Sequence, residues 1–137
     1  MNEFNIMTIS ATGMSAQRLR IDVISNNLAN SETTRTENGE PYRRKVPVFQ
    51  ELLRNINGRL ENGGVVVKKI YEDKSPFRIV YDPTHPDADE NGYVKLPNVN
   101  VVREMVDMIN AQRAYEANVT AFNTTKAMIN SALQIGR

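Results

Sequence analysis

Hydrophobic and small residues recur at helical spacing along the first thirty positions of the chain. Six of them fall on one face, four at steps of seven and two between: Met7, Ala11, Met14, Ile21, Ile24 and Leu28. The spacing predicts one helix over residues 3–29, about 40 Å long, that ends near Asn30, where Asn, Ser and Thr accumulate. Gly13 lies beside Ala11 and Ala16, and this small-residue patch allows another backbone to approach closely.

A second stripe runs through the last forty residues and predicts a helix over residues 101–135, about 52 Å long. Asn98 or Asn100 can cap its start, and Gly136 can end it. Two polar residues interrupt the stripe, whose members follow at steps of four and three: Met108, Gln112, Tyr115, Val119, Phe122, Lys126, Ile129 and Leu133. Four further apolar residues broaden it over the first turns, which favours more than one partner there: Val102, Met105, Val106 and Ile109.

The middle of the chain is punctuated by Gly and Pro, and it predicts short elements. Residues 65–71 and 77–81 have the β-branched and aromatic content of strands, with turn residues at 74–76 between them. Residues 42–49 predict another strand and residues 50–60 a short helix. We therefore expect three regions: an N-terminal helix and Asn-rich turn (1–34), a small β-rich module (35–97) that leans on the helices, and a C-terminal long helix (98–137).

Charge is distributed unevenly over the 137 residues. Residues 1–34 and 98–137 together hold 12 charged residues in 74, whereas the 63 between them hold 21. Helices exposed to water normally carry a quarter to a third charged residues, so we expect both terminal helices to be covered. The net charge of +1 gives no support for nucleic-acid binding, and no apolar run is long enough for membrane insertion.

The composition excludes most metal and thiol chemistry. With no Cys and one His, the chain has no thiolate nucleophile, zinc finger or two-His metal site. The sequence also contains no cofactor-binding motif. Asp87, Asp89, Asn91 and Gly92 match the first half of a calcium-binding EF-hand loop, but Asn98 replaces the final Glu, which favours an acidic surface turn. His85 is most simply a turn residue between two prolines.

Two polar groups leave alternatives open. Arg43, Arg44 and Lys45 form a basic run, for which a solvated strand edge is favoured over a nucleic-acid contact. The side chains of Asn26, Asn27 and Asn30 either cap the first helix or bond to a neighbouring subunit.

Two segments resemble the terminal signatures of the bacterial flagellar rod and hook proteins. Residues 9–36 read ISATGMSAQRLRIDVISNNLANSETTRT, and residues 105–128 read MVDMINAQRAYEANVTAFNTTKAM. The stretch SPFRIVYDPTHPDADENGYVKLPNVNVVREMVDMI, residues 75–109, is similar to the same region of proximal rod proteins. The chain is thus similar over nearly its whole length to the flagellar basal-body rod protein family.

The resemblance implies a mainly α subunit whose two terminal helices form coiled-coil layers in a hollow helical tube, with a small β-rich module. Such a subunit is structural, not an enzyme. It belongs to the driveshaft that crosses the periplasm and transmits torque from rotor to hook, and it is exported by the flagellar type III apparatus without a cleaved signal, consistent with Glu3 and the lack of an apolar core at the N-terminus. The implied partners are other copies, rod proteins of the B and F types, and the basal-body adaptor protein E.

An alternative of another class is a cytoplasmic coiled-coil module with a weak basic contact to nucleic acid. For the rod hypothesis, the expected assembly interface combines the helical stripes with neighbouring amides and one basic residue: Met7, Ala11, Met14, Ile21, Ile24, Asn26, Asn27, Leu28, Asn30, Met105, Met108, Gln112, Arg113, Tyr115, Asn118, Val119, Phe122, Lys126, Ile129 and Leu133.

Overall fold

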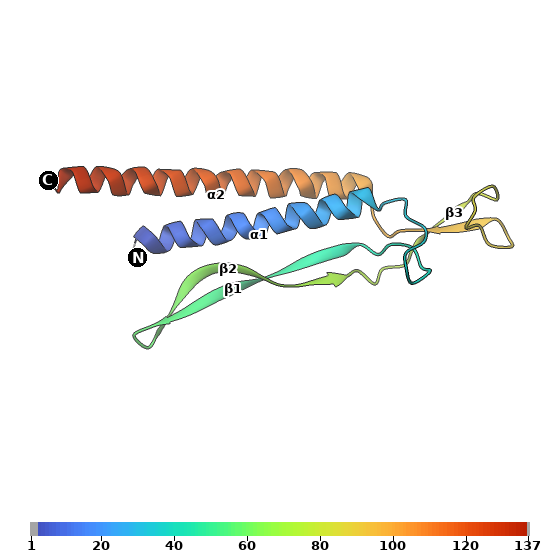
Figure 1. Ribbon diagram of the computed structural model, residues 1–137, viewed down its shortest axis with the longest axis horizontal. Coiled ribbons are helices and arrows are strands. Elements are labelled where there is room, and N and C mark those ends of the chain that lie inside the picture. The colour runs from blue at the N-terminus through green and yellow to red at the C-terminus, as the bar shows by residue number, and fades with distance from the viewer. Residues whose placement is uncertain (1–2, 137) are drawn as a thin grey trace.

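Two long helices dominate the computed structural model, which describes residues 3–136, with side chains from residue 5 onward. Helix α1 spans Glu3–Ala29 and helix α2 spans Val101–Ile135, so both predicted helices are confirmed. They lie side by side and antiparallel, with the start of α1 and the end of α2 at the same end of the molecule (Figure 1).

Polar side chains define the helix ends that the sequence predicted. The Asn100 side chain accepts a hydrogen bond from the Arg103 N–H at 3.1 Å, which makes Asn100 the N-cap of α2. At the other end, the Gly136 N–H donates to the Ala132 carbonyl. Helix α1 ends as expected at Asn30, whose backbone N–H and side-chain amide both donate to the Asn26 carbonyl.

The middle region contains a long antiparallel hairpin. Strand β1 (Lys45–Ile56) pairs with strand β2 (Arg59–Glu72) through a two-residue turn at Asn57 and Gly58, which have φ values of 53° and 79°. Positive φ at both turn residues is the geometry that Asn-Gly favours in hairpins. The predicted short helix over residues 50–60 is therefore wrong, because those residues form the hairpin tip.

A second, smaller sheet follows. Strand β3 (Arg78–Tyr81) pairs with strand β4 (Tyr93–Leu96). The strands predicted over 65–71 and 77–81 are confirmed as strands, but they belong to different sheets and do not pair with each other. Strand β4 was missed, because four residues are too short a run for a period-two pattern to be recognised.

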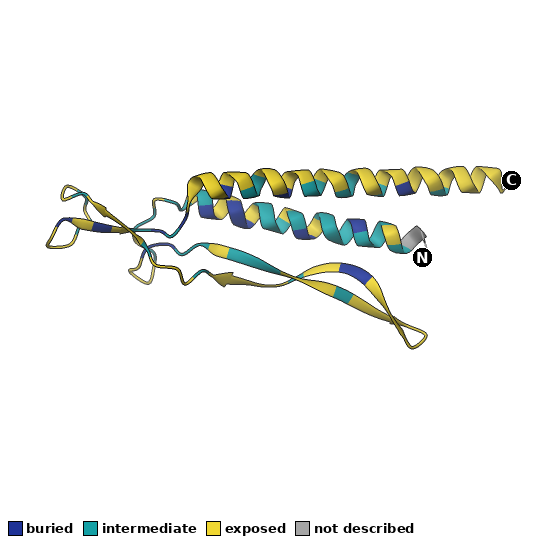
Figure 2. Ribbon diagram, turned by 180° about the vertical axis from the view of Figure 1, so that it is seen from behind, coloured by how far each residue is buried: buried dark blue, intermediate teal, exposed yellow. Residues whose placement is uncertain are grey.

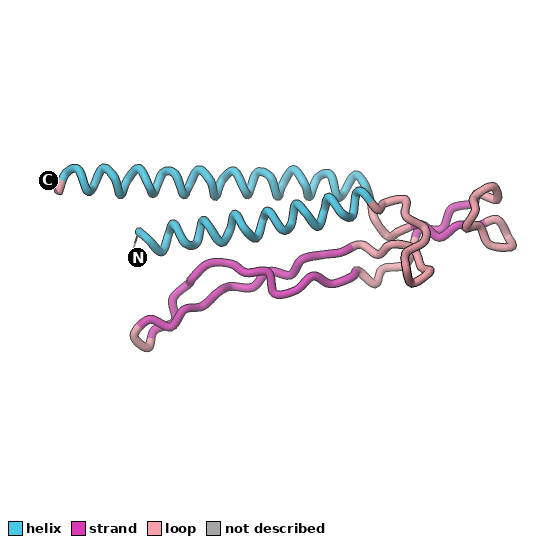
Figure 3. Tube along the Cα trace, in the orientation of Figure 1, coloured by secondary structure: helices cyan, strands magenta, loops and turns pink. Residues whose placement is uncertain are grey.

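Helix α1 forms the central layer of the molecule. It contacts α2 on one side and the β1–β2 hairpin on the other (Figures 1 and 3). The expectation that the β-rich module leans on the helices is thus confirmed for the hairpin but not for the β3–β4 sheet, whose strands contact neither helix within residues 3–136. Among the described elements, α2 contacts α1 alone. Buried positions accordingly gather on α1 and at the junction where the helices meet the strands, whereas α2 is largely exposed (Figure 2).

One close backbone contact fixes the hairpin on α1. A register shift between Glu51 and Leu53 leaves an extra residue in β2 at Gly63 and Gly64. Next to it, the Val65 N–H donates to Thr12 Oγ1 of α1 at 3.1 Å. A Cβ atom on Gly64 would lie 2.0 Å from that same oxygen, so only glycine permits this approach.

Candidate assembly interface

The contact between the two helices uses small and polar side chains. On α2, Glu104, Ala111 and Thr125 are buried, and the half-buried Asn118 lies between the last two, so the four residues follow at steps of seven. Asn118 lies against Gly13 of α1, where an added Cβ would come within 2.9 Å of its side-chain oxygen. The predicted small-residue patch is thus closely approached, and the approaching helix belongs to the same chain.

The residues of α1 proposed for assembly are mostly covered within the chain. Ile24 and Asn27 are buried, Asn26 is exposed, and the rest are half-buried: Met7, Ala11, Met14, Ile21, Leu28 and Asn30. Little of the expected α1 stripe therefore remains free for a neighbour.

The residues of α2 proposed for assembly divide into two groups. Those in or beside the row through Glu104 and Ala111 are half-buried: Met108, Tyr115, Asn118, Val119, Phe122 and Ile129. The others are exposed: Met105, Gln112, Arg113, Lys126 and Leu133.

An apolar surface remains uncovered on the first two turns of α2. Val102, Met105, Val106 and Ile109 are 71%, 55%, 52% and 50% exposed. Counting 100° per residue, they lie on the side of the helix opposite the row through Glu104 and Ala111. We call these four residues the outer apolar face.

The hairpin exposes a second set of apolar side chains, since its strands are covered on one side only, by α1. The exposed members are Phe49, Leu53, Ile56, Leu60, Val65, Val66, Ile70 and Tyr71. Successive side chains of a strand point to opposite faces, so these residues are divided between the two faces of the hairpin. Exposed apolar side chains in such number are typical of sites of protein association.

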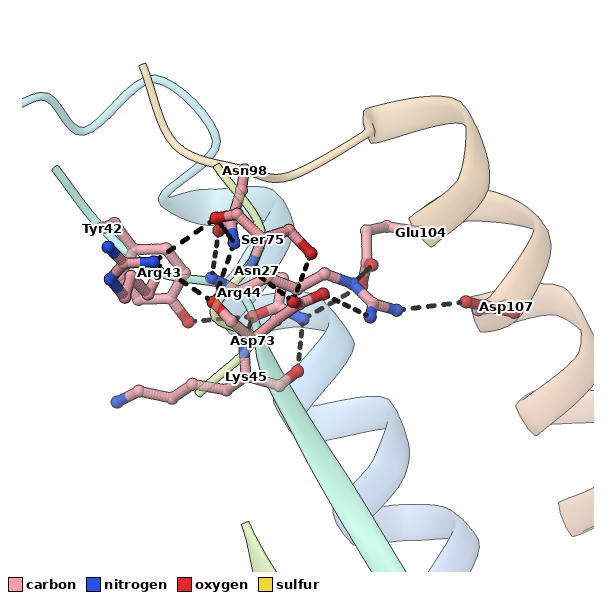
Figure 4. A network of polar contacts seen from close by, with 10 residues as sticks. All are labelled: Asn27, Tyr42, Arg43, Arg44, Lys45, Asp73, Ser75, Asn98, Glu104 and Asp107. Atoms are coloured by element: carbon pink, nitrogen blue, oxygen red, sulfur yellow. Dashed lines mark hydrogen bonds and ion pairs between the residues drawn. The ribbon is translucent and has the colours of Figure 1, made fainter. Parts of the chain in front are cut away.

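A polar cluster joins the helices to the strands at the junction (Figure 4). The Asn27 side chain, 1% exposed, lies at its centre: its amide donates to the Lys45 carbonyl at 2.8 Å and to Glu104 at 3.0 Å. Its oxygen accepts from the Tyr42 hydroxyl at 3.0 Å and from the Lys45 N–H at 2.9 Å. All the hydrogen-bonding capacity of this amide is used inside the chain.

Arg44 connects the same cluster to α2. Its guanidinium bonds to the buried Glu104 carboxylate and lies 3.7 Å from Asp73 and 3.6 Å from Asp107. Burial opposes the charge on Arg44, but the hydrogen bond to Glu104 and the nearby carboxylates outweigh burial and raise its pKa. Burial, with the charge of Glu104, also raises the pKa of the Tyr42 hydroxyl.

This cluster changes the interpretation of the basic run. Arg44 is neither on a solvated strand edge nor free for nucleic acid, because carboxylates surround it. Arg43 lies over the Phe77 ring, 4.2 Å from its centroid, and Lys45 over the Tyr42 ring. Glu104 was not predicted as a cluster member, although its position seven residues before Ala111 and fourteen before Asn118 places a carboxylate in the interface row.

The segment that matches the first half of an EF-hand loop forms turns, and its side chains bond to the residues that follow α1. Asp89 accepts from the N–H groups of Asn91 and Tyr93, and Asp87 accepts from the Thr34 hydroxyl at 2.7 Å and pairs with Arg35 at 2.8 Å. Within residues 3–136, no group of three or more His, Cys, Asp or Glu side chains is placed to hold a metal ion. Neither described helix combines the length and hydropathy needed to cross a membrane.

Comparison with known proteins identifies related chains over the full length. Residues 7–35 match the family described as flagella basal body rod protein, and residues 90–135 match the flagellar basal body rod FlgEFG protein C-terminal family. The chain is 52% identical to flagellar basal-body rod protein FlgC of Borreliella burgdorferi, covering 98% of each chain. It is 47% identical to that of Bacillus subtilis, covering 100% of both, and 42% identical to that of Salmonella typhimurium, covering 97% of both.

Proposed function

Because the chain belongs to the FlgC family of flagellar basal-body rod proteins and is a structural subunit of the rod, we propose that it polymerises through α2 and the hairpin. The observation that carries this proposal is the outer apolar face, which the chain's own fold leaves uncovered. Full burial of a Val, Ile or Met side chain contributes roughly 1.5–3 kcal/mol, so covering four half-exposed ones gives a substantial driving force.

The positions of the two exposed surfaces support a helical assembly. The outer apolar face and the exposed side of the hairpin lie on opposite sides of α1, in different layers of the molecule (Figure 1). A contact between two different surfaces of identical subunits is heterologous, and repeated heterologous contacts generate rings or helical filaments. In this proposal the helices form coiled-coil layers around a hollow tube, and the subunit transmits torque from rotor to hook.

We further propose the neighbours that the family resemblance implied. These are other copies of this chain, rod proteins of the B and F types and the adaptor protein E, reached after export through the flagellar type III apparatus into the periplasmic part of the basal body. The alternative of a nucleic-acid-binding module has lost its main support, because Arg44 is held by three carboxylates.

The proposal is tested by Val102→Asp and Met105→Asp. Each places a carboxylate on a surface that is solvated in the isolated subunit and buried in the assembly, so the cost falls on docking alone. We expect loss of rod assembly and motility, with an unchanged unfolding curve of the purified chain and normal export.

Lys95→Asp is the control, because Lys95 is exposed on β4, away from the outer apolar face. It should leave assembly nearly intact. Normal motility of the Val102 and Met105 variants would show that the outer apolar face does not contact other subunits.

A further inference from the structure

We propose that Arg44, Glu104 and Asn27 are positioning residues that select a single register of α2 against α1. The three form one buried polar cluster: Glu104 accepts from Arg44 Nε through one carboxylate oxygen and from the Asn27 amide through the other. The inference goes beyond the assembly proposal, since it concerns how one chain aligns its own two helices (Figure 4).

The connection between the helices does not fix their register. Short loops normally set the alignment of an antiparallel helix pair, but here residues 30–100, with both sheets, lie between α1 and α2. The register must therefore come from side-chain contacts: those at the helix–helix interface, and those of Asn98 just before α2 with Arg44, Asp73 and Ser75.

The central row of small side chains discriminates little between registers. The residues that α2 presents to α1 at steps of seven include Ala111, Asn118 and Thr125, which are all small or medium in size. A slip of one heptad moves one of them into the place of the next, for example Ala111 or Thr125 opposite Gly13, so this row by itself does not specify the alignment.

Glu104 is the charged member of this row, and it does discriminate. A slip of one heptad in one direction puts Ala111 opposite Asn27. The Asn27 amide then loses its carboxylate partner, and Arg44 loses Glu104 and Asp107 and keeps only Asp73. Buried polar groups without partners are costly, and single buried polar residues are known to specify the register of helix pairs.

The register also sets where the outer apolar face lies relative to the hairpin. Seven residues of helix correspond to about 10 Å, so a slipped subunit would present its two assembly surfaces at an axial offset changed by that amount. One register is thus a condition for a regular assembly.

The test measures register directly in the full chain, which has no native Cys. Spin labels on Ser25→Cys in α1 and Thr120→Cys in α2 sit at exposed positions and report one distance in the parent chain. Removing the cluster with Arg44→Met and Glu104→Leu together replaces the ion pair by apolar groups, which often preserves stability. We expect a second distance population, displaced by about 10 Å.

The matched control is the exposed ion pair between Arg78 and Glu32, removed by Arg78→Met and Glu32→Leu. It should leave a single population, as should Arg44→Lys, which keeps the charge. A single population in the Arg44 and Glu104 double variant would overturn the proposal. If that variant does not fold, Glu104→Gln decides: a minor second population supports the proposal, and its absence overturns it.

Discussion

The two long helices share a pattern of charge and hydrophobicity but differ in their surroundings. Both are poor in charge and carry apolar residues at steps of three and four. Helix α1 is covered by α2 on one side and by the hairpin on the other, whereas α2 is covered on the side of α1 only. Low charge therefore indicates that a helix requires a partner, but it does not indicate whether that partner comes from the same chain.

The difference assigns separate roles to the helices. Ala16, Val23 and Ile24 of α1 are at most 6% exposed, so α1 holds the subunit together. Helix α2 contributes Glu104 and Ala111 to the same core and presents Val102 and Met105 outward. In the assembly we propose, α1 determines the stability of the subunit and α2 determines its association.

The same substitution placed on each helix should separate these roles. Ile24→Ala in α1 removes a side chain that is 4% exposed and should lower the free energy of unfolding by about 2–4 kcal/mol. Ile109→Ala in α2 removes one that is 50% exposed and should change it by no more than about 0.5 kcal/mol, while weakening assembly. Urea unfolding followed by circular dichroism measures both, and equal losses would refute the division of roles.

The packing of the β1–β2 hairpin on α1 depends on Gly64. Gly64→Ala forces a Cβ against Thr12 Oγ1 and requires a non-glycine residue at φ +118°, so we expect a loss of about 1–3 kcal/mol and faster exchange of the Val65 amide hydrogen. Gly58→Ala is the matched control: its φ is +79°, but no atom lies within 4 Å of the added Cβ. It should cost less and leave the Val65 amide protected. Equal effects on Val65 would mean that backbone strain alone, without the contact to α1, explains the loss.

The sequence predicted the helices better than the strands for a physical reason. A stripe repeated over seven turns in residues 101–135 constrains both ends of a helix, and Asn100 and Gly136 confirm them. In the hairpin, the apolar residues between positions 49 and 60 also fit helical spacing. The Asn57-Gly58 pair favours a hairpin turn at this point, and that signal prevails over the helical spacing.

The candidate assembly interface also has a part that the sequence predicted and a part that it did not. Val102, Met105, Val106 and Ile109 were identified as a broadened stripe, and the structure leaves them exposed. The polar cluster could not be derived, because it joins Asn27, Arg44 and Glu104 across segments whose proximity depends on the whole fold. Local periodicity places Glu104 in the same row as Ala111, but it does not identify Asn27 and Arg44 as the partners of Glu104.

Removing the N-cap of α2, a helix that packs against α1 on one side, should have a smaller effect on stability. Asn100→Ala removes the acceptor for the Arg103 N–H and should cost about 1 kcal/mol. Its effect should be confined to the first turn of α2, seen as faster amide exchange at Arg103. Asn98→Ala is the comparison, because the Asn98 side chain bonds to the Arg44 N–H and to the carbonyls of Asp73 and Ser75 instead. If Asn98→Ala also frees the Arg103 amide, the two asparagines do not have the separate roles assigned here.

The smallest expected effect concerns the small sheet beyond the junction, which neither helix covers. The hydrogen bond from the Thr34 hydroxyl, aided by Arg35, lowers the pKa of the Asp87 carboxyl. Because the folded-state pKa is the lower one, this contact stabilises the fold above the unfolded value of about 3.9 and is lost as the pH falls through the lowered pKa. Thr34→Val should raise the pKa of Asp87 toward its ordinary value, as measured by NMR titration of the carboxyl carbon.

The pKa of Asp82, which is lowered by the Thr84 hydroxyl within its own loop, should not move. A shift of both would mean that Thr34→Val rearranges the whole loop, and an unchanged Asp87 would mean that Thr34 is not the cause.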